Sequence, residues 1–175
     1  MYSDSSPERH MDEHLLKVTR AHTTPDFAIA RELFVEYANG LDIELTFQGF
    51  QRELDALQDH YGRSDTCLLI ASDSQGACGC VGVRRFDAHT CEMKRLFVRQ
   101  KAQGAGVGRL LAKEAIAFAM RCRYQAMILD SLPTMVRAIG LYRSLGFSPV
   151  PAYYSNPVEG TLYMELRLSA EQHAG

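Results

Sequence analysis

The segment from Cys91 to Leu111 constrains the fold more than any other part of the chain. It reads CEMKRLFVRQKAQGAGVGRLL, an apolar run typical of a strand, then a basic turn, a glycine cluster and the start of a helix. Because Gly104, Gly106 and Gly108 carry no side chain, backbone N–H groups of this loop can approach an anion closely. The following helix begins with unpaired N–H groups and the positive end of its dipole. The segment therefore predicts a strand–loop–helix unit that binds a phosphate-bearing ligand.

The spacing of the glycines narrows the choice of ligand. A nucleoside-triphosphate loop requires G-x-x-x-x-G-K-[ST], and no Lys-Ser or Lys-Thr pair follows these glycines. A dinucleotide fingerprint requires G-x-G-x-x-G, whereas the spacing here is G-x-G-x-G, one residue short. The pattern present is Gln103-x-x-Gly106-x-Gly108. The spacing therefore argues against a nucleotide-binding domain. Tight binding of plain adenosine nucleotides would favour that interpretation again.

A second motif lies downstream, in the segment MVRAIGLYRSLGF that begins at Met135. Gly146 is placed to end a helix, and Phe147 opens the next strand. Four residues recur at steps of three and four and therefore share one face of that helix: Ala138, Leu141, Tyr142 and Leu145.

Together, the two motifs resemble those of the GNAT acetyltransferase superfamily. The glycine pattern is similar to its acyl-coenzyme A loop, and A-x-x-L-Y-x-x-x-G-F is similar to its element that closes over the thiol end of the coenzyme. One position departs from the family, because many members have Asn seven residues before this Tyr, where the chain has Met135. The resemblance covers roughly Leu15 to Leu168. It implies an α+β fold of three layers, α/β/α, around a mixed, mostly antiparallel, twisted sheet that is splayed at the coenzyme site.

The hydrophobic pattern along the chain agrees with that fold. We expect a flexible tail over residues 1–13 and a single N-acetyltransferase domain over residues 14–170. The predicted helices are 24–39, 47–60, 105–122 and one that follows Thr134 and carries Tyr142. The predicted strands are 15–19, 67–71, 77–86, 91–98, 126–130, one that opens at Phe147, and 162–168, whose alternation is typical of a half-buried edge strand.

Composition excludes several classes of protein. With 46% hydrophobic residues and a net charge of −2, the 175-residue chain has the make-up of an ordinary soluble domain. No apolar run approaches the ~20 residues that span a bilayer, and the N-terminus is polar, so we expect a cytoplasmic protein with no membrane partner. Five scattered cysteines lack zinc-ligand spacing, which predicts free thiols and no metal. The chain has no aromatic-interleaved basic stripe, so nothing supports a nucleic-acid partner.

The resemblance implies acetyl-CoA as cosubstrate, bound in the splay beside the central strand. In that arrangement the Val98 N–H polarises the thioester carbonyl, and backbone N–H groups from Gly104 to Arg109 hold the pyrophosphate. The basic residues Arg99 and Lys101 beside the loop complement its charge. The implied coenzyme-binding residues are Leu96, Phe97, Val98, Gln103, Gly104, Ala105, Gly106, Val107, Gly108 and Arg109.

Two residues are candidates for proton transfer. Tyr142 is the predicted general acid, because a phenol with a pKa of about 10 is protonated at neutral pH and can donate to a thiolate. Glu92, at the start of the central strand, is the candidate general base. Two interpretations of Glu92 stay open, the base and a surface glutamate paired with Lys94 or with an arginine on the neighbouring strand.

The acceptor side of the site is less defined by the sequence. Asp42 and Glu44 are candidates for attracting a cationic amine, and Tyr154 and Asn156 lie in a Pro-rich loop placed to cover the acceptor. The leading hypothesis is an N-acetyltransferase that moves acetyl directly, in a ternary complex, to the primary amine of a small molecule that resembles an amino acid, a polyamine or an aminoglycoside. The alternative is a non-catalytic acyl-CoA-binding sensor module. Many relatives dimerise but no residue fixes an interface, so a homodimer is left open.

Overall fold

The computed structural model describes residues 16–41, 43–45 and 48–168. The expected N-terminal tail, residues 1–13, therefore lies outside the described residues. The strands are β1 (Lys17–Arg20), β2 (Cys67–Asp73), β3 (Gly76–Arg85), β4 (Thr90–Val98), β5 (Ala126–Ser131), β6 (Ser148–Val150) and β7 (Leu162–Arg167). The helices are α1 (Thr24–Asn39), α2 (Phe50–Asp55), α3 (Leu57–Tyr61), the 3-10 helix η2 (Gln100–Ala102), α4 (Val107–Arg121) and α5 (Val136–Ser144).

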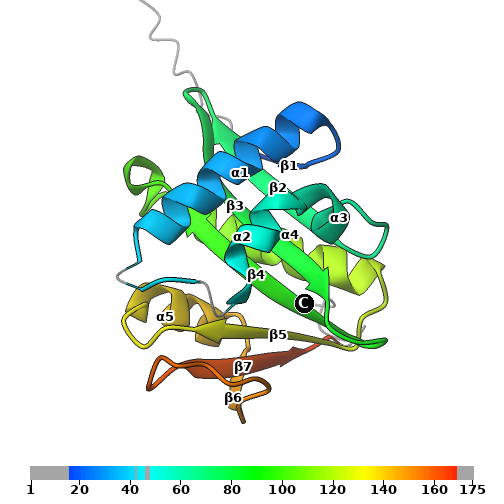
Figure 1. Ribbon diagram of the computed structural model, residues 1–175, viewed down its shortest axis with the longest axis vertical. Coiled ribbons are helices and arrows are strands. Elements are labelled where there is room, and N and C mark those ends of the chain that lie inside the picture. The colour runs from blue at the N-terminus through cyan, green and yellow to red at the C-terminus, as the bar shows by residue number, and fades with distance from the viewer. Residues whose placement is uncertain (1–15, 42, 46–47, 169–175) are drawn as a thin grey trace, which may run out of the picture.

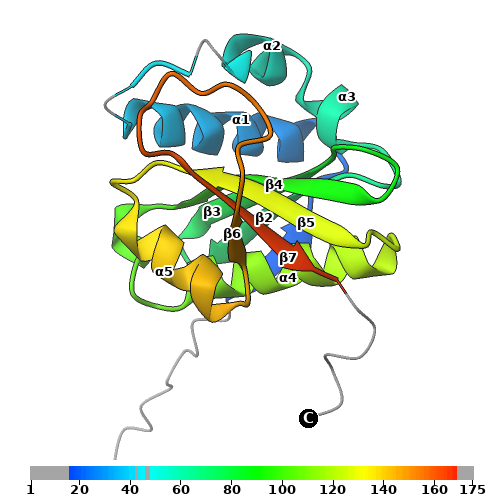
Figure 2. The same cartoon turned by 90° about the horizontal axis from the view of Figure 1, so that it is seen from below.

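The elements form three layers, as predicted. A 7-stranded sheet lies in the middle, with α1, α2 and α3 on one face and α4 and α5 on the other (Figure 2). The strand order is β1-β2-β3-β4-β5-β7-β6, and every neighbouring pair is antiparallel except β4–β5, which is parallel. The mixed, mostly antiparallel sheet of an α+β fold is therefore confirmed.

The parallel pair β4–β5 separates along its length. Its register runs only from Thr90↔Ala126 to Glu92↔Ile128, although both strands continue beyond these residues. Figure 1 shows the two strands meeting at one end and diverging toward the other. Beyond Glu92, the β5 side of β4 thus has no strand partner in the described residues, which leaves its backbone polar groups open to a ligand.

Two predicted elements differ from the structure. The strand over 162–168 is not an edge strand, because β7 pairs with β5 on one side and β6 on the other. Alternation reports which residues face the core, but not how many neighbours a strand has. The helix predicted over 47–60 is two helices, since Ala56 has the non-helical angles φ −134° and ψ 36°; Phe47 lies outside the described residues.

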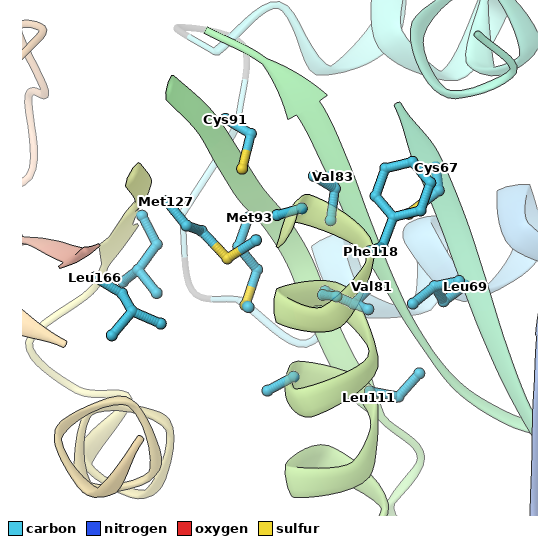
Figure 3. Close-up of a cluster of buried hydrophobic side chains, with 14 of the residues drawn as sticks. Cys67, Leu69, Val81, Val83, Cys91, Met93, Leu111, Phe118, Met127 and Leu166 are labelled. Atoms are coloured by element: carbon cyan, nitrogen blue, oxygen red, sulfur yellow. The ribbon is translucent and has the colours of Figure 1, made fainter. Parts of the chain in front are cut away.

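The core fills both faces of the sheet. Figure 3 shows the larger cluster, in which strand residues such as Val81, Met93 and Met127 pack against Leu111 and Phe118 of α4. Four of the five cysteines are buried and all five are free thiols, as predicted. In the described residues, no helix is both long enough and apolar enough to cross a membrane.

Candidate active site

A cavity of about 580 Å³ opens between the diverging end of β4, the start of α4 and the start of α5. Most of the predicted coenzyme-binding residues line it: Leu96, Phe97, Val98, Gln103, Gly104, Gly106, Val107 and Gly108. Ala105 and Arg109 are not in its lining. The Arg109 guanidinium instead donates to Ser144 Oγ at 2.9 Å, on the outer side of α5.

The glycine loop has a backbone conformation that favours glycine at two positions. Gly104 and Gly106 have φ values of +86° and +79°, in the left-handed region that residues with a Cβ rarely adopt. Gly106 is the N-cap of α4, and no side chain caps that helix. The N–H groups of the first turn of α4 therefore point their partial positive charge at the end of the cavity.

The open edge of β4 presents the Val98 N–H to the gap beside β5. The Arg99 N–H donates to Cys78 O of β3 at 2.8 Å. Since successive N–H groups of a strand point to opposite sides, the Val98 N–H points toward the gap beside β5. Gln103 has a supporting contact that the sequence did not predict, because its Nε2 donates to Val98 O at 3.1 Å.

Of the basic residues near the loop, Arg99 does not face the cavity. It makes two hydrogen bonds to Glu36 of α1, at 2.6 and 2.9 Å, and one to Ala77 O at 2.7 Å. These hydrogen bonds hold the pKa of the Glu36 carboxyl below its usual range. Arg99 thus ties α1 to the sheet, whereas Arg137 of α5, which the sequence analysis did not single out, lines the cavity.

A smaller recess of about 30 Å³ adjoins the cavity. The two share four lining residues: Tyr37, Leu41, Leu96 and Met135. Met135, which stands where many relatives have Asn, thus lies at their junction. The remaining wall of the recess carries most of its polar groups: Gln48, Lys94, Arg95, Asp130, Ser131 and Tyr142.

Tyr142 lies in the wall of this recess. Its side chain is buried, and its ring packs edge-on against Phe147 with centroids 5.8 Å apart. Its hydroxyl makes no hydrogen bond within the described part of the chain. Burial raises the pKa of Tyr142 above its usual range, so the phenol is protonated at neutral pH. The position and the protonation state both suit the predicted general acid, whose role stays a prediction.

A bulge in β4 brings two cations to one face of the sheet. Arg95 has φ +58°, and the β3–β4 register shifts between Cys80 and Gly82. The extra residue breaks the alternation of the strand, so Lys94 and Arg95 both face the layer of α1 and α2. There Lys94 Nζ lies 3.0 Å from Asp130 Oδ1 and 3.4 Å from a Glu92 oxygen.

Arg95 is held by a buried network of its own. Its guanidinium donates to Glu53 Oε2 at 2.7 and 3.2 Å and to Gln48 Oε1 at 2.7 Å. The hydroxyl of the fully buried Tyr61 donates to the other oxygen of Glu53. Burial opposes ionisation of Glu53, but Arg95 and Tyr61 outweigh it, so the pKa of Glu53 lies below its usual value.

The four residues predicted to contact the acceptor lie in different places. The Tyr154 hydroxyl donates to Asp130 Oδ2 at 2.9 Å and accepts from Asn156 Nδ2 at 3.0 Å, so this pair lies directly behind the recess. Glu44 is exposed and lines a separate surface pocket with Arg52. Asp42 lies outside the described residues.

Residues 18–147 match the model of the Acetyltransferase (GNAT) family. The chain belongs to this family. An uncharacterized N-acetyltransferase of Schizosaccharomyces pombe is 40% identical to it over 139 residues, which cover 78% of this chain and 85% of that protein. The chain is accordingly an acyltransferase of the GNAT type, as the two sequence motifs predicted.

Solved structures agree on the fold. An acetyltransferase of Streptococcus agalactiae has a TM-score of 0.72 at 20% identity, over 87% of this chain and 98% of its own. An acetyltransferase of Salmonella typhimurium, solved with its cofactor acetyl-CoA, has a TM-score of 0.65 at 21% identity, over 91% and 96% of the two chains. These likenesses confirm that the chain has the GNAT fold.

In this GNAT domain Glu92 lies apart from both cavities. Its side chain is 2% exposed, and the Arg84 guanidinium of β3 is 2.7 Å away. Tyr153 donates to its other oxygen at 3.1 Å, and Lys94 approaches that oxygen too. Glu92 is thus paired with both partners that the second interpretation named, but in the interior and not on the surface. The geometry favours the ion pair, and the role of general base stays a prediction.

The pH–rate profile of Glu92→Gln separates the two interpretations. We expect the acidic limb to keep its midpoint, because Glu92 lines neither cavity, and we expect a lower melting temperature, because Arg84 loses its buried partner. Asp59→Asn, an isosteric change of an exposed carboxylate, is the control for a loss of negative charge. A flattened acidic limb would instead establish Glu92 as the base.

Gln48, Asp130 and Ser131 belong to no motif recognisable in the sequence, and Lys94 was predicted only as a partner of Glu92. A usable signal was present in β4 and β5. Both strands combine apolar residues with charged ones, and a charged residue in a buried strand is rare unless it is paired or functional. Lys94 and Asp130 were each other's partners, which only the pairing of the strands reveals.

Proposed function

We propose that this GNAT acyltransferase transfers the acetyl group of acetyl-CoA to the primary amine of a small molecule, directly and within a ternary complex. The observation that carries the proposal is the meeting of two cavities at the β4–β5 splay. The larger has an anion-binding helix start at one end, and the smaller is polar and contains the Tyr142 phenol. The cosubstrate is further supported by the Salmonella typhimurium neighbour solved with acetyl-CoA.

Each part of the cavity has a role in this reaction. The first turn of α4 and the glycine loop bind the phosphates of the coenzyme, since N–H groups and the helix dipole favour anions. The free edge of β4 binds the amides of the pantetheine arm as an added strand would, and the Val98 N–H is aimed at the thioester carbonyl. Tyr142 donates its proton to the departing thiolate.

The recess supports a small primary amine as acceptor. At about 30 Å³ it exceeds the ~10–15 Å³ that one water needs, which is room for an amine group but not for a folded peptide segment. Its polar lining suits a group with several N–H donors. Amino-acid-like, polyamine-like and aminoglycoside-like amines share such a group, so all three remain candidate acceptors.

The test is a calorimetric titration with acetyl-CoA, followed by release of free thiol across a panel of these three amine classes. We expect saturable binding and thiol release that depends on the amine added. Binding without release from any amine would contradict transfer to a small amine and favour the sensor alternative. Absence of binding would contradict the proposed cosubstrate.

Gly106→Asp tests the phosphate site. We expect the Kd for acetyl-CoA to rise at least tenfold, because a carboxylate at the start of α4 repels phosphates and occupies the helix dipole. Gly76→Asp is the matched control, since Gly76 also has a positive φ (+114°) and open space where a Cβ would stand, but lies at the start of β3. Equal loss of affinity in both variants would contradict the assignment of the loop.

A further inference from the structure

We propose that Asp130 is the residue that recognises the ammonium group of the acceptor, and that the recess admits only the end of an unbranched primary amine. The inference rests on the proposed function, because it gives the acceptor half of that reaction a site. It concerns a carboxylate that neither the glycine loop nor the α5 motif contains.

Asp130 is a carboxylate in the wall of the recess that, among the described residues, keeps an oxygen lone pair free. Its side chain is 9% exposed. A carboxylate accepts about four hydrogen bonds. Lys94 occupies one position on Oδ1 at 3.0 Å, and Tyr154 and Gln48 occupy two on Oδ2 at 2.9 and 3.4 Å. One acceptor position therefore remains for a ligand with an N–H group.

The contacts of Asp130 also hold it ionised. Burial alone favours the protonated acid, but Lys94 and Tyr154 outweigh it, so the pKa of Asp130 lies below its usual value. An ionised carboxylate with a lowered pKa is a weak proton acceptor, but it accepts short, charge-assisted hydrogen bonds from N–H donors. Asp130 thus suits accepting a hydrogen bond from the amine of the acceptor better than the role of general base.

Ser131 gives an independent indication that a ligand enters the recess. Ser131 is one of the residues that line the recess and is 3% exposed, yet its Oγ has no hydrogen-bond partner in the described residues. Buried hydroxyls without a partner are rare in native proteins, and a bound water or ligand is one explanation for such a group. Successive residues of a strand point to opposite faces, so Asp130 and Ser131 reach the gap from either side of the sheet.

The size of the recess limits the group that fits. A primary ammonium is about as large as a water molecule, and the recess of about 30 Å³ holds one or two such groups. A quaternary ammonium is several times larger and has no N–H to donate. The recess therefore selects a slender terminal ammonium, while the rest of the acceptor lies outside it.

Methylammonium is a probe for this site that needs no knowledge of the acceptor. In ¹H–¹⁵N spectra of the full-length protein, we expect methylammonium chloride to shift the amides of Asp130 and Ser131 saturably, and tetramethylammonium to leave them unchanged. In Asp130→Asn the Kd for methylammonium should rise at least tenfold, and in Ser131→Ala severalfold. The variant Asp59→Asn, which alters an exposed carboxylate, should bind methylammonium as the wild type does.

Equal methylammonium affinity in the wild type and Asp130→Asn, or equal shifts with tetramethylammonium, would overturn the inference. The Ser131→Ala variant keeps the test decisive if Asp130→Asn does not fold, because loss of one hydroxyl leaves the Lys94–Asp130 pair intact. Failure of the proposed function is a different result. It would show as no acetyl-CoA binding or no amine-dependent thiol release by the wild type, whether or not methylammonium binds.

Discussion

Tyr142→Phe is expected to lower kcat by about 10²- to 10⁴-fold, the usual contribution of a general acid, while the Kd for acetyl-CoA stays within about twofold. The variant removes a hydroxyl in the wall of the recess that makes no hydrogen bond within the described residues. The leaving thiolate then has to take its proton from water. Stopped-flow or steady-state thiol release, combined with calorimetric titration of acetyl-CoA, measures the two quantities separately.

The fold should tolerate this change. Phenylalanine keeps the edge-on contact with Phe147, and the lost hydroxyl leaves no partner unsatisfied. Tyr124→Phe is the matched control, because Tyr124 is equally buried (6%) but lines neither cavity and donates to Asp65 O. An unchanged kcat in a well-folded Tyr142→Phe protein would remove Tyr142 from the role of acid.

The direction of the Tyr142 pKa gives a second expectation for the wild type. Burial raises this pKa above that of a free phenol, about 10, so Tyr142 stays protonated through the alkaline range in which free tyrosine ionises. The alkaline limb of kcat should therefore not fall because of Tyr142 below about pH 10. A loss of activity near pH 8 or 9 has to come from another group.

The coenzyme half of the site could be predicted because its signals are local. A strand, a glycine loop and a helix start follow one another from Cys91 to Leu111, and the structure folds them as a continuous unit. The α5 motif is equally local. Even here the sequence could not predict the direction of individual side chains. Arg109 and Arg99 contact Ser144 and Glu36 and do not line the cavity.

The acceptor half could not be predicted in the same way. Gln48, Lys94, Asp130 and Tyr154 come from four distant segments and meet only through the strand order and the separation of β4 from β5. The bulge at Arg95 also breaks the period-two alternation on which a sequence argument depends. The available signal was the presence of charged residues in strands that also carry many apolar residues. Such residues indicate that a site is present, but not which side chains they contact.

The bulge at Arg95 leads to the second large expected effect, on stability. Glu53→Gln should lower the free energy of unfolding by about 3–5 kcal/mol, the range measured when one partner of a buried ion pair is removed. Arg95 would remain 5% exposed in a strained left-handed conformation, with only Gln48 and neutral contacts to satisfy its charge. Chemical denaturation followed by circular dichroism measures the loss.

Glu36→Gln is the control for this second variant, because it makes the same change in another Glu–Arg pair. The Glu36–Arg99 pair is as short, at 2.6 Å, but its side chains are 42% and 36% exposed. Solvent screens such a pair, so the expected loss is only about 0–1 kcal/mol. Equal losses in the two variants would contradict the argument that burial makes the Arg95 network costly to break.

The pH dependence of stability tests the same network through protonation of the Glu53 carboxylate. The pKa of Glu53 is lowered in the folded state, so its contribution is fully present above the unfolded value of about 4.3 and is lost as the pH falls through the folded value. The wild type should lose stability over this acidic window, and Glu53→Gln, which has no proton to bind there, should lose less. The two stability curves should therefore converge at low pH, and parallel curves would show that Glu53 is not ionised in the folded protein.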